Sequence, residues 1–487
     1  LGPCGLRDNP DNPNAAIGGY GYSNQGTIDG NGVWQPRASF NYSFDTERPT
    51  QLRGGAGLFV SNTPAVWVAN PYSNNGVAVA SYDVNHLREP TDPPFSSGPQ
   101  VLPGTSTTPG LGRSSMGVSV VDPDFQIPTV AKYTIGLDHE LPWQGLVFTT
   151  EFQHLDVVKG IKYDNINLGA PTGVLPDGRF SYARNPNDAP GSSNTTRWNA
   201  NPSFSGSTIL LTNTDKGYSD NLTFSLNKPF ANDWSAMVAY TMSRATDVNP
   251  GTSSVANSSF SNRAWTNPNA DELGTSNYEI PQRLLASFTY EHAFFGDYKT
   301  SFTAFYDGHS GAPYSWIFGN DVNGDSYVRD LAFIPLNRGD VQFTPGTSLE
   351  AIDSFYEYIA NNKQLQRNAG SIFKRNNARA GWVNQVDLGF TQEIPGFAEG
   401  HKGSIRFDVF NFLNMLNKDW GVEHRADFPL TRNLANYAGV DPATGKYIYN
   451  ITPYLVNGKY TPNGLPVNES LSPSQRWSVS LTLRYEF

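Results

Sequence analysis

Apolar and polar residues alternate one by one along residues 477–487, the stretch that ends the sequence. A period of two predicts a β-strand with one apolar and one polar face. At about 3.3 Å per residue and a tilt near 40°, this stretch rises roughly 25 Å, the height of an outer-membrane barrel's apolar band. Aromatic residues near both ends suit the two membrane interfaces, although a soluble β-sandwich can also end in an alternating strand. The apolar positions are Trp477, Val479, Leu481, Leu483, Tyr485 and Phe487.

The same alternation recurs along the chain and predicts about thirteen strands. Short turns at 47–50, 142–145, 231–233, 295–297 and 395–403 join consecutive strands, and long loops at 61–128, 160–213 and 311–381 separate the pairs. The predicted strands cover residues 37–44, 52–60, 132–138, 146–152, 222–226, 234–242, 284–290, 302–306, 386–390, 405–409, 421–428, 446–454 and 477–487.

Connections sorted by length in this way are typical of a transmembrane antiparallel β-barrel, with short periplasmic turns and long extracellular loops. The predicted fold class is therefore all-β. An odd number of strands leaves an open sheet whose edges carry unpaired backbone groups in lipid. We expect either a further strand before Val33 or strands upstream of Leu1, with residues 1–487 forming the C-terminal part of a larger barrel.

Composition and charge limit the classes of protein that this sequence can represent. The sequence has no run of roughly 18 apolar residues that would form a membrane helix, and a polar lumen reconciles a mean hydropathy of -0.45 with a membrane barrel. A net charge of -10 argues against nucleic acid as a partner. No signal peptide opens the sequence, so we expect that the start of the exported protein has been removed. The single cysteine, Cys4, is either a buried thiol or the partner of an upstream cysteine.

Six blocks spread over most of the chain carry a more specific signal. They read YSNQGTIDGN at 22–31, FDTERPTQLRGG at 44–55, NTDKG at 213–217, FFGDYKT at 294–300, WVNQVDL at 382–388 and NMLNKDWG at 414–421. Together they resemble the C-terminal barrel of the Oar-like TonB-dependent receptors of the Gram-negative outer membrane.

This resemblance implies a function and a larger architecture. Such receptors carry an N-terminal carboxypeptidase-regulatory-like domain, a TonB box, a plug and a barrel of about 22 strands. The first three are not visible in this sequence, so the thirteen predicted strands would be the tenth to the last. The resemblance implies TonB-coupled movement of a ligand across the outer membrane, with TonB engaged through the N-terminal part. It leaves the ligand open, since the group has been associated with cargo as large as peptides and proteins.

One loop carries a candidate metal site. Oxygen-bearing side chains recur around a glycine at Asp321, Asn323, Asp325 and Asp330, which suits Ca²⁺ because this ion takes about six to eight oxygen ligands in a loose geometry. The pattern is not an EF-hand, because the glycine comes too early and the twelfth position is Ala332. The alternative is an Asx-turn hairpin with solvated carboxylates.

The longest loop is predicted to hold a short helix over about 348–361. Thr347 and Glu350 fit a capping box, and Leu349, Ile352, Phe355 and Ile359 form an apolar stripe at helical spacing. We expect this helix to pack over the barrel mouth rather than to contact ligand. The basic cluster that follows either is a solvated face or meets an anionic ligand or lipopolysaccharide phosphates; it comprises Arg367, Lys374, Arg375 and Arg379.

Charges of both signs alternate with the apolar positions of the strands and are expected to face the lumen. There they are expected to pair with one another or with a plug rather than to bind cargo. They are Arg37, Arg53, Lys132, Asp138, Glu140, Glu151, Asp307, Asp387, Arg406, Asp408, Arg484 and Glu486.

An enzyme is not expected, because the seven histidines show no metal-ligand spacing and no nucleophile elbow, Walker loop or dinucleotide fingerprint occurs. The sequence thus predicts an integral outer-membrane receptor and transporter that binds its ligand with long extracellular loops. A passive 14-stranded channel and a surface structural or adhesion protein are the alternatives. Expected partners are outer-membrane lipid, lipopolysaccharide, TonB, and surface proteins or lipoproteins that dock on the loops.

Overall fold

The computed structural model describes most of the chain, and everything below concerns that part: residues 20, 22, 28, 30–61, 64–73, 118–184, 200, 206–462 and 475–487. Most of the predicted loop 61–128, parts of 160–213, and Cys4 lie outside it.

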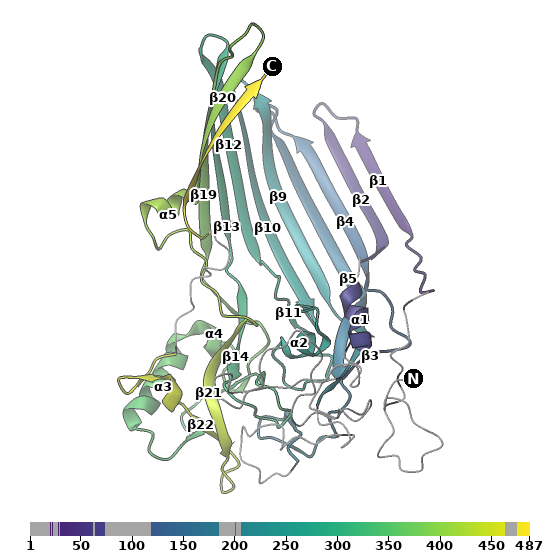
Figure 1. Cartoon of the computed structure of the whole chain (residues 1–487), viewed down its shortest axis with the longest axis vertical. Coiled ribbons are helices and arrows are strands. Elements are labelled where there is room, and N and C mark those ends of the chain that lie inside the picture. The colour runs from purple at the N-terminus through teal and green to yellow at the C-terminus, as the bar shows by residue number, and fades with distance from the viewer. Residues whose placement is uncertain are drawn as a thin grey trace, which may run out of the picture.

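A curved antiparallel sheet of eleven long strands, here called the wall, dominates the structure (Figure 1). Each wall strand is paired with its neighbour in sequence order. The wall strands are β1 (Arg37–Phe44), β2 (Thr50–Val60), β4 (Thr129–Glu140), β5 (Val147–Asn165), β9 (Tyr218–Ala231), β10 (Trp234–Asp247), β12 (Gln282–Phe295), β13 (Tyr298–His309), β19 (Val383–Pro395), β20 (Lys402–Phe410) and β25 (Ser478–Glu486).

Short turns gather at one end of the wall, beside the C-terminus, and long connections gather at the other end (Figure 1). One of the two-residue turns consists of Asn232 and Asp233, which join β9 to β10 with φ angles of 55° and 67°. Two consecutive positive φ angles are typical of the type I′ turn, whose twist matches that of the flanking strands. The predicted sorting of connections by length is therefore confirmed for the described strands.

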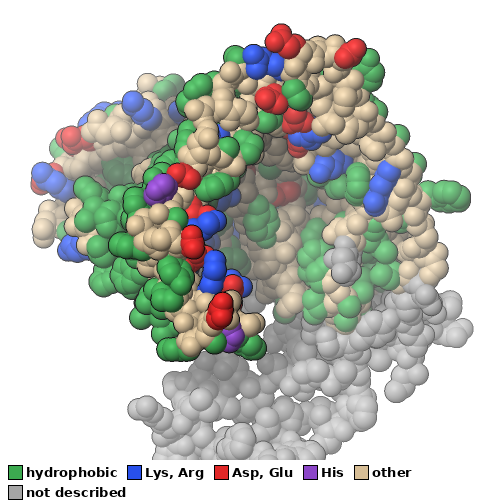
Figure 2. Space-filling view, turned by 90° about the horizontal axis from the view of Figure 1, so that it is seen from above, with side chains coloured by type: hydrophobic (Ala, Val, Ile, Leu, Met, Phe, Trp, Pro, Cys, Tyr) green, Lys and Arg blue, Asp and Glu red, His purple; other side chains and the backbone are tan. Residues whose placement is uncertain are grey.

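The strand faces separate as the alternation predicted. Large apolar side chains cover the outer face and remain exposed to the surroundings: Phe40, Phe288 and Leu481 are 52%, 45% and 64% exposed. Charged side chains line the hollow on the concave side (Figure 2). A water-soluble sandwich would bury these apolar rows, so the exposed rows favour a wall that contacts lipid.

Two predicted wall strands were wrong. Residues 421–428 contribute no strand to the wall. The predicted strand 446–454 contains β22 (Tyr447–Asn450), which lies in a separate five-stranded sheet with β14, β16, β18 and β21. Its alternation is real, but Tyr447, Tyr449 and Ile451 face a protein core instead of lipid.

The connections at the long-loop end fold into what we call the loop layer. Three helices and eight strands occupy its first part: α1 (Ala65–Ser73), β3 (Val118–Val121), β6 (Gly173–Val174), β7 (Phe180–Ser181), β8 (Thr208–Thr214), α2 (Ala256–Ser261), β11 (Gly274–Thr275), β14 (Pro313–Phe318), β15 (Phe333–Ile334), β16 (Gln342–Phe343) and α3 (Leu349–Asn361). The remainder holds α4 (Lys363–Gln366), β17 (Ser371–Ile372), β18 (Ala378–Arg379), β21 (Thr431–Val440), β22, η2 (Thr452–Tyr454), β23 (Leu455–Val456) and β24 (Lys459–Tyr460). Helix α5 (Phe412–Leu416) lies outside this layer, beside β19 (Figure 1).

Both lateral edges of the wall are open within the described residues. β1 pairs only with β2, and β25 pairs only with β20. No helix in the described part of the chain is both long enough and apolar enough to span a membrane.

Substitution of a lipid-facing residue tests the assignment of faces. Leu481, opposite Phe407 near the middle of β25, lies on the outer face, whereas its neighbour Ser480 lies on the concave face opposite Asp408. We expect Leu481→Arg to lower the free energy of unfolding in lipid vesicles by about 2–4 kcal/mol. Ser480→Arg, the matched control, should cost far less, because it faces a polar lumen and a carboxylate. Equal losses in urea-unfolding measurements of the two variants would contradict the assignment.

Candidate functional site

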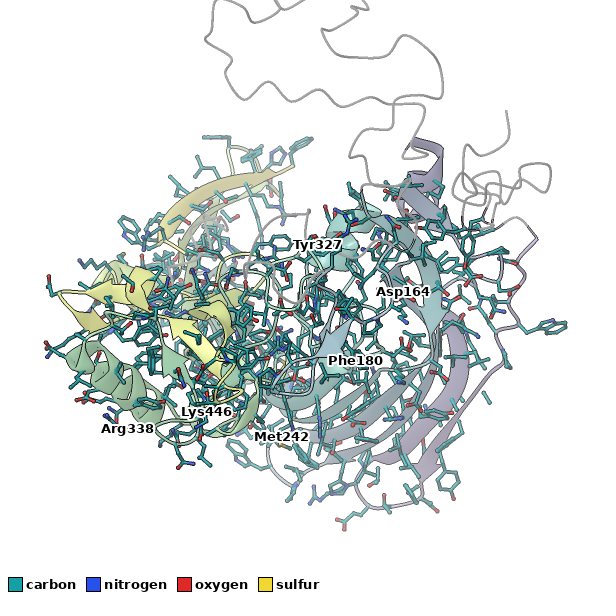
Figure 3. All side chains as sticks on the ribbon, turned by 90° about the horizontal axis from the view of Figure 1, so that it is seen from below. Asp164, Phe180, Met242, Tyr327, Arg338 and Lys446 are labelled. Atoms are coloured by element: carbon teal, nitrogen blue, oxygen red, sulfur yellow. The ribbon has the colours of Figure 1, made fainter. Side chains whose placement is uncertain are left out.

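The loop layer is the candidate functional site, because it covers the concave side of the wall at the end where the long connections meet. Seen from below, Tyr327, Asp164 and Phe180 lie within the curve of the wall strands, whereas Arg338 lies outside it, beside α3 (Figure 3). The loop layer has well-packed apolar cores of its own.

The larger core combines β14, β18, β21, β22, α3 and α4, and the part of the loop layer built around this core is here called the α3 unit. All six residues of β14 are buried, and aromatic rings meet edge to face, as between Phe318 and Tyr449 at 5.4 Å and between Phe355 and Tyr460 at 4.9 Å. Such contacts stabilise beyond the area they bury. These loops are therefore held in one arrangement rather than being independent chains.

The predicted helix is present as α3 and belongs to this core. The hydroxyl of Ser348, not Thr347, caps it by accepting a hydrogen bond from the backbone N–H of Ala351 at 3.2 Å. Phe355 and Ile359 are buried, but Leu349 is 78% exposed, so the predicted stripe was one residue too long. The helix packs and does not offer an apolar face to a ligand.

A second core lies at the loop-layer end of β5, where this strand extends beyond its wall neighbours. Tyr163 of β5, Ile209 of β8, Phe260 of α2 and Trp265 are fully buried in it. Tyr327 reaches this core from the 321–330 loop and contacts the rings of Phe260 and Trp265 at 5.3 and 5.7 Å.

The 321–330 loop joins the two cores, with Val322 in the larger core and Tyr327 packed against the second. The loop also docks closely on the segment after β7. A Cβ at Gly324, where φ is 78°, would lie 2.6 Å from the backbone nitrogen of Ala183, so this position requires glycine.

Most carboxylate oxygens of this loop accept hydrogen bonds from backbone N–H groups. Asp321 accepts from the N–H groups of Gly324 and Ser326, both at 2.8 Å. Asp325 accepts from Tyr327 N–H at 2.8 Å and from the indole N–H of Trp265 at 3.0 Å. These contacts make a network of Asx turns, as one of the two interpretations of the loop predicted.

One arginine inserts into this loop from the β6–β7 hairpin. Arg179 is completely buried; it donates to Asp177 at 2.6 Å, to Asp330 at 3.3 Å and to the carbonyl of Leu331 at 2.6 Å. The sequence analysis did not single out Arg179 and Asp177, because no local pattern links them to Asp330, which lies 151 residues after Arg179.

The Asx-turn interpretation also predicted solvated carboxylates, and this part was wrong, because the carboxylates of Asp321, Asp325 and Asp330 are buried. Burial raises the pKa of Asp321 to about 6 and the pKa of Asp330 to about 7. Burial, with repulsion from Asp330 and Asp321, raises the pKa of Asp325 well above its ordinary value. Burial lowers the pKa of Arg179, but the charges of Asp177 and Asp330 outweigh it and raise that pKa overall.

The described residues hold no group of three or more His, Cys, Asp or Glu side chains arranged to bind a metal ion. Asp321, Asn323, Asp325 and Asp330 do come together, but their oxygens are directed largely to N–H groups. The structure therefore gives the calcium prediction no assembled set of ligands. A proton shared within the buried carboxylates is the alternative way to offset their excess negative charge.

The predicted basic cluster does not form one surface. Arg375 is buried and donates to the Asp247 carboxylate at 2.9 Å and to the carbonyl of Val248 at 3.2 Å. Arg379 pairs with the Glu279 carboxylate and donates to the Glu279 carbonyl at 3.1 Å. These two arginines tie the α3 unit to the ends of the wall strands, while Arg367 and Lys374 remain exposed.

On the concave face of the wall, most predicted lumen charges pair across or along strands. Arg53 pairs with Glu151 and, at 3.0 Å, with Asp138. Asp307 pairs with Arg283, which the sequence did not single out, at 2.7 Å. The remaining pairs are Arg406 with Asp408 and Arg484 with Glu486, and Asp387 accepts from the backbone of Asn411. Internal pairing is thus confirmed for these residues.

A comparison with known protein families identifies the family of this chain. The family profile described as "Outer membrane beta barrel domain" matches residues 7–419, which is more than half of the chain. The chain belongs to this family. It is an integral protein of the outer membrane, with its apolar outer face in lipid and its short turns at one membrane surface. The comparison does not extend to the Oar-like group.

Two solved structures are similar to this outer-membrane barrel over large parts of its length. The outer membrane transporter YddB from Escherichia coli is 9% identical, with a TM-score of 0.38 over 82% of this chain and 37% of the other. A mutant of the ferric enterobactin receptor PfeA from Pseudomonas aeruginosa is 10% identical, with a TM-score of 0.36 over 93% and 40%. The barrel chain thus spans well under half the length of either protein. No curated protein sequence matches it.

The pH dependence of the loop layer tests the state of its buried carboxylates. Native Asp330 keeps its proton to about pH 7, whereas an unfolded aspartate loses it near pH 4, about its ordinary pKa. Between these values the folded state holds more protons, so stability falls as pH rises, by up to about 1.4 kcal/mol per pH unit for one group. Asp330→Asn should flatten this fall, and Asp353→Asn, at an exposed ion pair in α3, should not.

Hydrogen-exchange protection of β14 between pH 4.5 and 8, corrected for intrinsic exchange, measures this effect. Stability that rises with pH in the wild type would contradict the assignment. So would a saturable gain on adding Ca²⁺ that Asp330→Asn abolishes, since it would show that the carboxylates are metal ligands.

The anchoring of the α3 unit is tested at Arg375. Arg375→Met leaves Asp247 and two carbonyl groups without their donor, and we expect it to destabilise this attachment by about 3–5 kcal/mol. Limited proteolysis should then cut residues 371–380 faster while the wall strands stay resistant. Lys374→Met, at the exposed neighbour, serves as the control; equal sensitivity of the two variants would show that Arg375 is not an anchor.

Proposed function

We propose that this chain is part of a TonB-dependent receptor that moves a ligand across the outer membrane. The paired, polar concave face of the wall is the observation that supports this most directly. A lumen lined by ion pairs such as Arg53 with Asp138 and Glu151 suits a wet passage filled by a plug rather than an apolar interior.

In this proposal further strands complete the barrel. The eleven strands of the wall have an open edge at β1 and another at β25 within the described residues. Open edges in lipid leave backbone groups unpaired at a cost of several kcal/mol each. Eleven is half of the roughly 22 strands of plugged outer-membrane transporters, so the complete receptor would supply the other strands, the plug and the TonB box.

The loop layer selects the ligand. Its two cores and the anchors at Arg375 and Arg379 hold it rigidly over the lumen, which reduces the entropy lost on binding. The β6–β7 hairpin is the best-placed contact: Val174 and Phe180 pair across it and are 65% and 43% exposed. Arg179, buried directly beside Phe180, fixes the hairpin from below.

The outer leaflet supplies the lipopolysaccharide partner. A pocket of about 410 Å³ near the loop end of β25 is lined by Lys418, His424, Arg476 and the interfacial Trp477, with Asp419 as its acidic member. Cationic side chains beside an interfacial tryptophan suit phosphate groups at the membrane surface.

Conductance and TonB coupling test the function together. The full-length receptor in planar bilayers should show little steady conductance, because a plug blocks the lumen. It should also cross-link to the periplasmic domain of TonB, and should lose the cross-link when its N-terminal region is deleted. Steady conductance without TonB would identify a passive channel, and a closed barrel without any TonB contact would favour a surface structural protein.

A further inference from the structure

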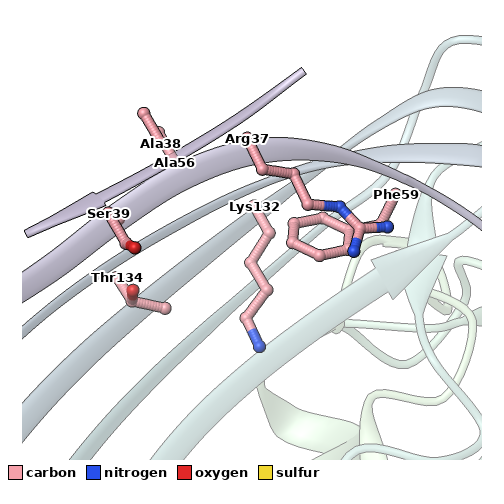
Figure 4. A pocket seen from close by; sticks show the side chains of 8 residues that line it. Arg37, Ala38, Ser39, Ala56, Phe59, Lys132 and Thr134 are labelled. Atoms are coloured by element: carbon pink, nitrogen blue, oxygen red, sulfur yellow. The ribbon is translucent and has the colours of Figure 1, made fainter. Parts of the chain in front are cut away.

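Among the described residues, two cations of the lumen wall lack the carboxylate partner that neighbouring lumen arginines have. The side chain of Lys132 in β4 forms no hydrogen bond or ion pair with any described residue. Among these residues, the guanidinium of Arg37 in β1 donates to the side-chain oxygen of Gln35, at 2.9 Å. By contrast Arg53, Arg283 and Arg406 each pair with a carboxylate. Both cations line a pocket of about 330 Å³ (Figure 4).

Strand register places these two cations on either side of a glycine. Gly57 of β2 is opposite Arg37 of β1 and also opposite Lys132 of β4. Adjacent strands lie about 4.8 Å apart, so the two cations arise roughly 10 Å from each other across a position without a side chain. An anion above Gly57 would contact both.

The next row repeats the arrangement with hydroxyl groups. Gly55 of β2 is opposite Ser39 of β1 and Thr134 of β4. The bare backbone of Gly55 and Gly57 thus forms a floor with two cations at one end and two hydroxyl groups at the other. A Cβ at Gly57 would lie 2.8 Å from Cγ of Arg37, so a side chain there would displace the arginine.

Phe59 orients one of the cations. The guanidinium of Arg37 lies 4.3 Å from the centre of the Phe59 ring, within the range of a cation–π contact. This contact occupies the guanidinium face and leaves its N–H edge for an acceptor. Figure 4 shows Arg37 beside this ring and Lys132 extending from its strand.

The pocket lies near the loop-layer end of the wall. Arg37 begins β1, and Lys132 is close to the start of β4, far from the short turns that close β1 and β4 at the other end. A ligand that enters from outside would therefore reach this pocket before the rest of the lumen.

We propose that this pocket binds the anionic group, a phosphate or a carboxylate, of the ligand that the receptor moves. Lys132 and Arg37 neutralise the charge, and the hydroxyl groups of Ser39 and Thr134 donate further hydrogen bonds to its oxygens. The inference rests on the proposed function for the identity of the anion as cargo, but anion binding itself can be measured without transport.

Calorimetry on the full-length receptor in detergent micelles tests this with two probes, inorganic pyrophosphate and citrate. We expect saturable binding of at least one probe that weakens with added salt; which probe binds more tightly distinguishes phosphate from carboxylate cargo. Lys132→Met should weaken binding by about tenfold or more, and Thr134→Val by less. Lys132→Arg should retain most of it.

Lys402→Met is the matched control, since it removes a cation at the opposite end of the wall, opposite Glu486. It should leave binding unchanged. Absence of saturable binding of both probes, or binding that Lys132→Met does not weaken, would overturn the proposal. Loss of TonB coupling with anion binding intact would contradict the proposed function and not this site.

Discussion

Backbone hydrogen bonding in lipid is the constraint on which this structure depends. A polar peptide group cannot remain unpaired in a hydrocarbon layer, and the eleven strands of the wall pair their backbone groups with those of their neighbours. Pairing in turn fixes the side-chain period at two. Each of the eleven wall strands therefore presents one row to lipid and one to the lumen, and the sharply different polarity of these rows follows from that geometry.

The connections at the long-loop end are not constrained by lipid, and they fold into the compact loop layer next to the wall. There the dominant interactions change: aromatic contacts such as Phe355 with Tyr460 form the core, and buried ionic groups join the parts. Arg179 links the β6–β7 hairpin to the 321–330 loop, and Arg375 links the α3 unit to β10. A rigid layer of this kind can discriminate among ligands, whereas mobile loops would lose affinity to the entropy of ordering.

The sequence predicted features that depend on short-range pattern. The faces of β1, β12 and β25 follow from alternation alone, and α3 follows from its helical stripe and its cap. Alternation cannot say what a face meets, however, and so β22 looked like a wall strand although Tyr447 and Tyr449 face a protein core. Spacing also singled out the aspartates of the 321–330 loop, but their burial and their partner Arg179 depend on tertiary contacts.

The candidate anion site shows the same division. Arg37 and Lys132 could be assigned to the lumen from alternation, but their meeting across Gly57 depends on the register of three strands, which no local pattern specifies. Likewise, Arg375 and Arg379 appeared as part of a basic cluster, and only the fold shows that carboxylates at the wall already neutralise them.

Site-directed spin labelling of β25 tests the central claim, that its alternate residues face lipid and lumen. Cys4 is the only cysteine of residues 1–487. Replacement of Cys4, and of any cysteine in the rest of the full-length receptor, by serine permits single-cysteine labelling at each position from 478 to 486 in lipid vesicles. The account predicts that labels at odd positions are more accessible to lipid-soluble oxygen, and labels at even positions to a water-soluble nickel complex. Accessibilities without a period of two, or with the two faces reversed, would contradict it.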